Sequence, residues 1–325
     1  MHKHLYTVDE VTKMIKEGRV LLVAGDESLL IQLPDGEWVG GTIPYFMTRH
    51  GGMYTNELLY VTDITNEVTN VKIQTYDENS IHRLLEDSFE NGFSYIVVPA
   101  LTKVLEKYAL EAPNWDNLYV NPVVGWVTGV RYEDFGSAHP KTFAGNKSFT
   151  DKAVVLHAEM PKGKVARTEI INVYEQGDGD EIYFDERGFG NNQCVVNGEK
   201  HDLYQYFQTK NVNEKLPLVA NYAGANINVG SIWNKESKRA DLFAPVFPNT
   251  VYKVAKSRDI NYPEEFREKI SGDAGANIIF SCNCLFNYIN FQLEGRAIEN
   301  VTGPVTFGEI AYHLLNQTFV YLVIE

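Results

Sequence analysis

The stretch Ala276-Asn-Ile-Ile-Phe-Ser-Cys-Asn-Cys284 combines an apolar run with an abrupt polar end. Apolar runs of this length are typical of buried strands. In α/β folds, ligands often bind where such a strand ends and the chain turns into a helix. The stretch therefore predicts a strand over 276–282 and a ligand pocket at its end, lined by Ser281, Cys282 and Asn283.

Helical periodicity on both sides of this strand predicts a helix, strand, helix order, which also occurs earlier in the chain. The predicted helices of these two regions cover residues 81–91, 102–110, 263–270 and 285–293. Between the first two lies an apolar strand that follows Gly92, just as the later strand follows Gly275. The parallel indicates two halves of similar architecture.

The remaining chain is rich in short strand patterns. Thr7 and Glu10 fit a capping box and predict a helix over 8–17. Segments 20–24, 29–33, 58–64, 68–76, 153–159 and 165–173 predict strands. We therefore expect a mixed α/β (α+β) fold in which two mainly β domains carry helices on their faces. The glycine-rich segment 188–192 suggests a boundary between domains 1–190 and 191–325.

Composition narrows the class of protein and of partner. The 325 residues are 44% hydrophobic, which is enough for a sizeable core, and the formal net charge is -14. An acidic surface repels phosphate backbones and anionic lipid, so we expect neither nucleic acid nor membrane as a partner. The N-terminus lacks a signal-peptide core, no apolar run is long enough to span a membrane, and the three cysteines do not suggest a disulfide framework. These features favour a cytoplasmic location.

The segment 38–52 is aromatic and contains two Gly-Gly pairs. Paired glycines allow close approach of the backbone to a ligand, which would involve Thr42, Tyr45 and Arg49. Paired glycines also occur in ordinary tight turns and bulges. Both interpretations stay open from the sequence.

Cys282 has two further interpretations. A thiol at the start of a helix can act as a nucleophile, although no histidine of the sequence is an evident base for it. The Cys282-Asn-Cys284 spacing is not that of a zinc site, and no metal or cofactor is expected. Sequence patterns for nucleotide loops, serine hydrolases and zinc proteases are absent.

Glu309 is the one charged residue of an otherwise uncharged stretch, Gly303-Pro-Val-Thr-Phe-Gly-Glu-Ile310. Its carboxylate either lies at the surface where an element begins or faces a polar cavity. In a cavity it would recognise an amine or a hydroxyl group of a ligand.

Three segments of the C-terminal part resemble the FIST sensory family of bacterial signal-transduction proteins and some eukaryotic F-box proteins. They are Val196-Asn-Gly198, Phe280-Ser-Cys282 and the stretch that ends in Ile310. The resemblance implies a FIST C-terminal-like domain over 191–325 and a FIST N-terminal-like domain over 1–190. It also implies sensing of a small molecule such as an amino acid or related metabolite, and no catalytic residues. The chain departs from the family where Cys284-Leu-Phe286 follows the Ser-Cys pair.

We therefore expect a non-catalytic, cytoplasmic, small-molecule-binding sensory protein that signals through a separate partner protein. Its expected ligand-binding residues are Thr42, Tyr45, Arg49, Ser281, Cys282, Asn283 and Glu309. The alternatives are an enzyme that uses Cys282 as its nucleophile and a non-catalytic scaffolding protein.

Overall fold

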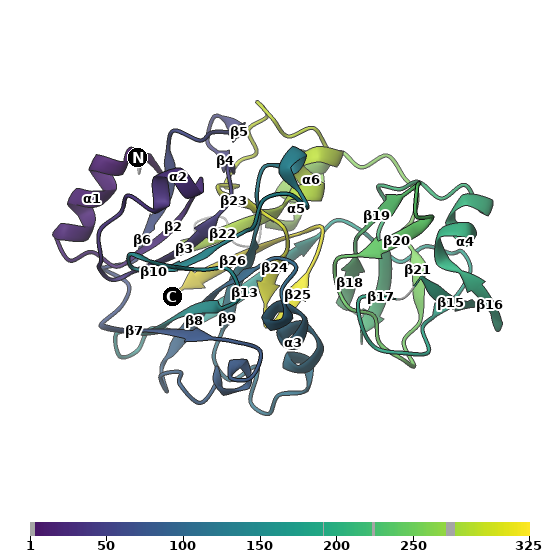
Figure 1. The fold of residues 1–325 in the computed structure, drawn as a ribbon, viewed down its shortest axis with the longest axis horizontal. Helices are drawn as coiled ribbons and strands as arrows, with labels where there is room; N and C mark the ends of the chain where they lie inside the picture. Colours follow the sequence, from purple (N-terminus) through teal and green to yellow (C-terminus); the bar gives the residue numbers. More distant parts are fainter. Residues whose placement is uncertain (1–3, 191, 223–224, 271–276) are drawn as a thin grey trace.

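A computed structural model describes residues 4–190, 192–222, 225–270 and 277–325. Figure 1 shows a larger body and, at the right of the view, a smaller lobe formed by the middle of the chain. Strands outnumber helices in both parts, and the predicted mixed α/β class is confirmed. Within the described ranges, no helix combines the length and apolar character needed to cross a bilayer.

The body contains three copies of one structural unit. Each unit runs from a first strand through a helix, a central strand, a second helix, a strand parallel to the central one and a hairpin to a return strand. In the first unit these are β1 (Leu5–Tyr6), α1 (Val8–Lys16), β2 (Leu21–Gly25), α2 (Glu27–Leu30), β3 (Trp38–Thr42), β4 (Tyr45–Thr48), β5 (Gly51–Tyr54) and β6 (Leu59–Asp63).

The other two units follow the same order. In the second, a 3-10 turn takes the place of the first helix: β7 (Asn70–Tyr76), η1 (Ile81–Arg83), β8 (Gly92–Pro99), α3 (Lys103–Glu111), η2 (Ala112–Asn114), β9 (Val123–Thr128), η3 (Tyr132–Asp134), β10 (Thr142–Ala144), β11 (Lys147–Phe149) and β12 (Ala153–Glu159). The third has the lobe inserted after its first strand: β13 (Ala166–Asn172), α5 (Tyr262–Ile270), β22 (Ile278–Cys284), α6 (Leu285–Asn290), β23 (Gly303–Thr306), β24 (Glu309–Ala311), β25 (His313–Leu315) and β26 (Thr318–Ile324).

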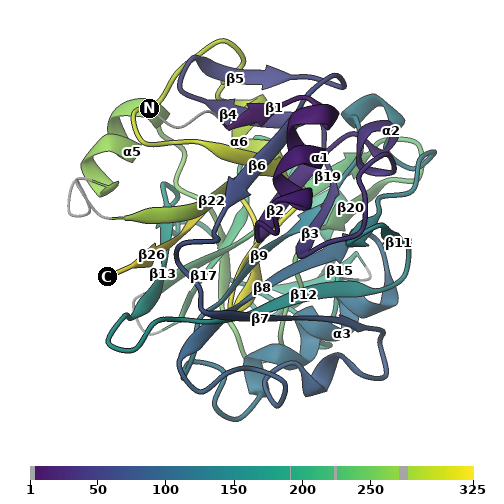
Figure 2. The same cartoon turned by 90° about the vertical axis from the view of Figure 1, so that its left-hand side faces the viewer.

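Equivalent strands pair in the same way in all three units. The return strands β6, β12 and β26 each lie antiparallel between the first and the central strand. Parallel pairs are formed by β2 with β3, β8 with β9 and β22 with β23. The hairpin of the next unit completes each sheet, because β10 pairs with β3, β24 with β9 and β4 with β23. The three six-stranded sheets of the body are thus linked in a closed cycle. Helix α1 lies at the left edge of the body in Figure 1, and α5 and α3 lie at its margins in Figure 2.

The main core forms where strands of the three units face one another. The Tyr95 ring on β8 packs edge-on against Phe280 on β22, with 4.8 Å between ring centres. Trp126 on β9 donates its indole N–H to the Tyr95 hydroxyl at 2.6 Å. All three side chains are buried. This packing satisfies the polar groups of the large aromatic residues inside an apolar interior.

Glycine allows the parallel strands to approach closely. A Cβ added to Gly40 on β3, Gly125 on β9 or Gly303 on β23 would lie 2.0, 1.8 or 2.0 Å from a carbonyl oxygen of the neighbouring central strand. No side chain fits at that distance from a backbone atom. The three units therefore share a requirement for glycine on the second parallel strand.

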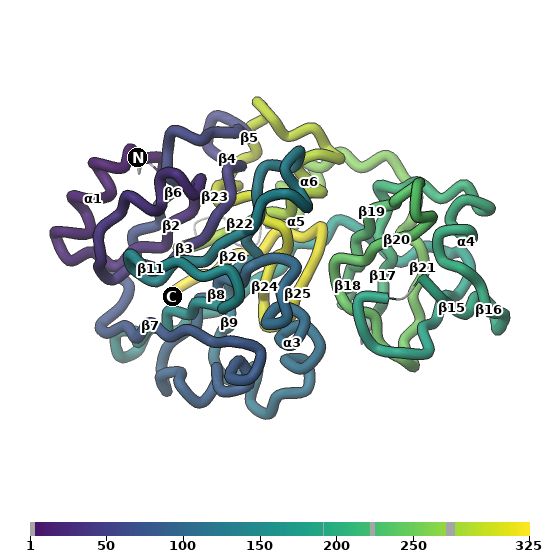
Figure 3. Tube along the Cα trace, viewed as in Figure 1, coloured from purple at the N-terminus to yellow at the C-terminus, as the bar shows by residue number. Residues whose placement is uncertain are grey.

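The lobe is an insertion between β13 and α5. Its elements are β14 (Ile182–Tyr183), β15 (Gln193–Val196), β16 (Glu199–Asp202), α4 (Leu203–Thr209), β17 (Leu218–Tyr222), β18 (Ala225–Val229), β19 (Ser231–Asn234), β20 (Arg239–Leu242) and β21 (Tyr252–Val254). It has its own apolar core, which includes Phe207 and Tyr252. The chain enters and leaves the lobe side by side, since Lys256 N donates to the Glu175 carbonyl at 2.9 Å. Figure 3 traces these two connections.

Two local predictions are wrong. Residues 29–33 were expected as a strand, but Asp26 accepts a hydrogen bond from Ser28 N and begins the short helix α2. Residues 81–91 were expected as a helix, but only a 3-10 turn forms at their start. The backbone bonds of this segment are mostly between residues three apart, such as Leu84 N to the Ile81 carbonyl at 3.1 Å, and the Asp87 carbonyl accepts from Lys72 Nζ on β7 at 2.8 Å. The capping box of Thr7 and Glu10 is confirmed.

The structure does not separate the chain into two domains at residue 190, where the sequence suggested a boundary. The predicted similarity of two regions is confirmed, because β8 and β22 are equivalent central strands, and β2 adds a third. Gly275 and Ala276 lie outside the described residues. Strands from both sides of residue 190 share sheets, such as β13 with β26 and β9 with β24. The chain therefore divides into the three-unit body and the lobe inserted between β13 and α5.

Candidate functional site

Each unit has two parallel strands that end at the same edge of their sheet. The second strand of every pair ends in a buried threonine: Thr42 on β3, Thr128 on β9 and Thr306 on β23. The ends are joined between units, since Gly129 N donates to the Thr42 carbonyl at 2.8 Å. The carboxyl ends of parallel strands are the usual ligand sites of such sheets.

A cavity of about 430 Å³ opens beside the ends of β2 and β3. Its walls are the turn from β2 into α2, the residues after β3, and the segment 129–139. The polar side chains that line it belong to Asp26, Glu27, Ser28, Thr42, Tyr54, Arg131, Asp134 and His139. Its volume falls in the range of cavities that hold small molecules.

The segment 129–141 is an addition to the repeated unit. In the first and third units only residues 43–44 and 307–308 separate the parallel strand from its hairpin. The longer segment is fastened to the first unit: Lys141 N donates to Thr42 Oγ1 at 2.9 Å and Tyr132 N to the Tyr45 hydroxyl at 3.1 Å. It therefore closes one side of the cavity.

Charges of both signs face this cavity. The Arg131 guanidinium lies 5.8 Å from the centre of the Tyr54 ring and forms an exposed ion pair with Glu133 at 2.9 Å. Glu27 is paired with Lys141. Asp134 adds a further carboxylate, so the cavity offers a guanidinium and carboxylates to one ligand.

Cys282 lies inside the body rather than in an open pocket. Its side chain is fully buried, and its Sγ can donate a hydrogen bond to the Gly125 carbonyl oxygen at 3.6 Å. Burial raises the pKa of the Cys282 thiol well above its usual value, and Glu309 adds to this rise at alkaline pH, where its carboxyl group is ionised. A neutral, inaccessible thiol is a poor nucleophile.

Asn283 and Glu309 belong to a buried polar network. Thr318 donates to Glu309 Oε2 from its backbone N at 3.2 Å and from its hydroxyl at 2.9 Å. Thr306 Oγ1 lies 3.2 Å from Glu309 Oε1 and 3.3 Å from the Asn283 carbonyl oxygen. Tyr262 donates its hydroxyl to Asn283 Oδ1 at 3.1 Å. Neither sequence interpretation of Glu309 describes this arrangement: the residue begins β24 but is fully buried, and its oxygens contact protein groups.

Burial raises the pKa of the Glu309 carboxyl to about 8, even though the bonds from Thr318 and Thr306 favour the ionised form. No ion pair with a cation accompanies it within the described residues. Around neutral pH the carboxyl group is therefore mostly protonated. A protonated Oε1 can donate to Thr306 Oγ1, which in turn can donate to the Gly308 carbonyl at 3.1 Å.

The other expected residues lie in two places. Thr42 lines the cavity beside β2 and β3, and Tyr45 supports its wall. Arg49 and Ser281 line a separate hollow of about 780 Å³ between β6 and β22. There the Ser281 hydroxyl is already used, because it donates to the Thr302 carbonyl. The seven predicted residues thus do not form one pocket.

A buried hydrogen-bonded chain in the second unit has the residue types of a catalytic relay. Ser94 Oγ lies 2.8 Å from His157 Nδ1, the Tyr76 hydroxyl lies 3.0 Å from His157 Nε2, and the same hydroxyl donates to Asp87 at 2.8 Å. Ser94 is only 1% exposed, so a substrate could not reach it. Burial lowers the pKa of His157 to about 4, which keeps the imidazole neutral. We interpret this chain as core structure.

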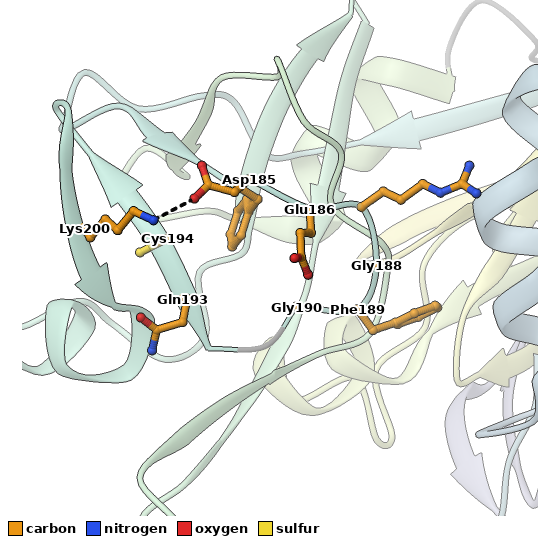
Figure 4. A pocket seen from close by; sticks show the side chains of 10 residues that line it. Asp185, Glu186, Gly188, Phe189, Gly190, Gln193, Cys194 and Lys200 are labelled. Atoms are coloured by element: carbon orange, nitrogen blue, oxygen red, sulfur yellow. Dashed lines mark ion pairs between the residues drawn. The ribbon is translucent and has the colours of Figure 1, made fainter.

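The lobe has a hollow of its own, of about 370 Å³, shown in Figure 4. It is lined by the turn that carries Asp185 and Glu186 and by Gln193 and Cys194 on β15. The Lys200–Asp185 ion pair beside it spans 3.4 Å, and both side chains are largely exposed. Exposed pairs of this kind are weak and favour no particular ligand.

A family model matches nearly the whole chain. Residues 6–325 match the model of DUF6976, a family of unknown function. The chain belongs to this family. No curated protein matches it. Membership of DUF6976 thus covers all three units and the lobe without assigning them an activity.

Sequence reasoning missed several cavity residues of this DUF6976 member. Arg131, Asp134 and His139 lie in a stretch that has no periodicity. A comparison of the repeated segments within the chain could have found them. The Gly-x-x-Thr patterns that end at 128 and 306 mark equivalent strand ends, and only the second unit has a long segment after its threonine. In the described parts of the chain, no group of three or more His, Cys, Asp or Glu side chains could hold a metal ion.

Proposed function

We propose that this protein is a non-catalytic, small-molecule-binding sensory protein whose ligand occupies the cavity beside β2 and β3. The observation that carries the proposal is the position of that cavity. It lies at the carboxyl ends of parallel strands and is closed by a segment that the other two units lack. This site replaces the pocket that the sequence suggested around Cys282.

The charges of the cavity favour a small zwitterion, such as an amino acid or a related metabolite, as the ligand. Arg131 would pair with a carboxylate, and Asp134 or Asp26 would pair with an ammonium group. Thr42 Oγ1, which already accepts from Lys141 N, is free to donate its own proton to a ligand.

The relationship to FIST proteins, a cytoplasmic location and a separate signalling partner are further parts of the proposal. The FIST relationship rests on three short sequence segments, of which Val196-Asn-Gly198 falls in the lobe and the other two in the body. The three cysteines are free thiols, which favours a reducing compartment.

Mass spectrometry of molecules that copurify with the protein, followed by thermal-shift assays with each standard amino acid, tests the proposed function. We expect a ligand that raises the melting temperature and binds Arg131→Gln at least about tenfold more weakly, because a charged hydrogen bond is lost.

The matched control is Arg83→Gln, since Arg83 is also an exposed arginine close to a glutamate. It should bind the ligand as the unmodified protein does. Equal binding by Arg131→Gln and Arg83→Gln, or no copurifying molecule and no thermal shift with any amino acid, would contradict the proposal.

A further inference from the structure

A further cavity, of about 560 Å³, lies between the lobe and the body. The body contributes the C-terminal end of α3, the following turn and the β24–β25 hairpin. The lobe contributes β18 and the segment 244–252. The interdomain cleft, as we call this cavity, shares no residue with the cavity beside β2 and β3.

The two walls of the interdomain cleft are held together by asparagine side chains. Asn228 on β18 donates its Nδ2 to the Asn316 carbonyl at 3.2 Å, and Asn316 Oδ1 accepts from Gly230 N at 3.2 Å. Asn172, at the end of β13, donates to Asn228 Oδ1 at 2.9 Å. Asn228 and Asn316 are fully buried. Because Asn228 lies between the cleft-lining residues Ile227 and Val229, these bonds fix the lobe to the body beside the cleft.

The lining of the interdomain cleft is uncharged. None of its 17 residues is Asp, Glu, Lys or Arg, whereas these types make up 22% of the chain. Most of the lining is aliphatic or aromatic, and Ile170 and Tyr119 leave 42% and 63% of their surfaces open to solvent. A charged ligand would lose its hydration there without gaining a counter-charge, while apolar surface would be favourably covered.

A hydrogen-bonding pair occurs in this apolar lining. The Tyr119 hydroxyl is hydrogen-bonded to His313 Nε2, and both residues line the cleft. Burial lowers the pKa of His313, so the imidazole adds no charge near neutral pH. Tyr119 can therefore orient a ligand through a single neutral hydrogen bond.

We infer that the interdomain cleft is a second binding site, which takes a neutral and mainly apolar small molecule with one hydrogen-bonding group. The uncharged lining sets the class of ligand. The volume suits a small molecule, because it falls within the range of about 300–1,000 Å³ that is usual for such sites. The site is independent of the ligand proposed for the cavity beside β2 and β3.

Fluorescence titration of the full chain with Nile red, a neutral apolar dye, tests the inference. We expect saturable binding with one dye per chain. Ile170→Glu, which places a charge in the cleft, and Ala225→Trp, which fills it from the exposed start of β18, should each weaken binding at least tenfold. The control is Ile289→Glu, because Ile289 is 41% exposed, like Ile170, but lies outside the cleft.

Circular dichroism melting shows whether each variant remains folded. Two substitutions at different positions are used, so that the test still stands if one variant loses dye binding because it unfolds. Absence of saturable Nile red binding would overturn the inference, and so would equal binding by Ile170→Glu, Ala225→Trp and Ile289→Glu. Equally tight binding of the anionic dye 1-anilinonaphthalene-8-sulfonate would overturn the neutral class. Arg131→Gln should leave Nile red binding unchanged, which separates this test from that of the proposed function.

Discussion

Glu309 shows how a polar side chain can serve the interior of the fold. Its carboxyl group accepts hydrogen bonds from Thr318, lies beside Thr306 and is fully buried, and no cation of the described residues pairs with it. Cys282, buried nearby, is fully screened from solvent, and burial raises the pKa of its thiol. Both residues thus belong to the interior of the body, and the enzyme alternative based on Cys282 gains no support from its surroundings.

The stability of the protein should depend on pH through Glu309. Its pKa is about 8 in the folded protein against an ordinary value of 4.5, so between these values the folded state binds a proton that the unfolded state has lost. The contribution of Glu309 therefore falls as pH rises from 4.5 to 8. Glu309→Gln mimics the protonated form: relative to it, the free energy of unfolding of the original protein should drop by roughly 3–5 kcal/mol over this range.

Urea unfolding of both proteins at several pH values measures this difference, and contributions from other groups, such as His157, cancel between them. Glu236→Gln, at an exposed position, is the matched control and should show no such trend. A difference that stays constant from pH 5 to 8 would show that Glu309 has an ordinary pKa.

At the scale of elements, the parallel strand pairs determine where the sheets can join. Each second strand passes its neighbour at a glycine and ends in a threonine, and the hairpin of another unit then completes the sheet. Helices α2 and α6, which follow the central strands β2 and β22, are short. The ends of the parallel strands β2 and β3 line the cavity.

Gly125→Ala should disrupt the pairing of β8 and β9. The added Cβ would lie 1.8 Å from the Ile96 carbonyl oxygen, which is backbone and cannot rotate away. We expect a loss of more than about 3 kcal/mol in the free energy of unfolding, or no folded protein. Gly179→Ala is the control, because nothing lies within 4 Å of its added Cβ; it should change stability by less than about 0.5 kcal/mol. Equal stability of the two variants would argue against the close strand contact.

At the scale of the whole molecule, the lobe is a unit added to a complete body. Its entry and exit strands are adjacent, because Gln176 and Ala255 form a bridge. The body closes its cycle of sheets without it, through the pairing of β13 with β26. The cleft between the two parts arises from the insertion.

Replacing residues 177–254 by a short Gly-Ser linker should leave a body that melts cooperatively, with some loss of stability because the Asn172–Asn228 and Asn316–Asn228 contacts disappear. Circular dichroism and calorimetry measure the transition. The contrasting cut after residue 190 should give no folded fragment, since it separates β26 from β13. A folded fragment 1–190 would contradict the three-unit body.

The sequence by itself determined the local features: the capping box at Thr7, the apolar strands around Gly92 and Phe280, and the mixed α/β class. These depend on periodicity and on hydrogen bonds between near neighbours. Only the tertiary structure decided which strand ends meet, because the hairpin that completes each sheet comes from a different unit. For the same reason the position of Cys282 inside the body, and of Arg131 at a cavity, follows from contacts between residues far apart in the chain.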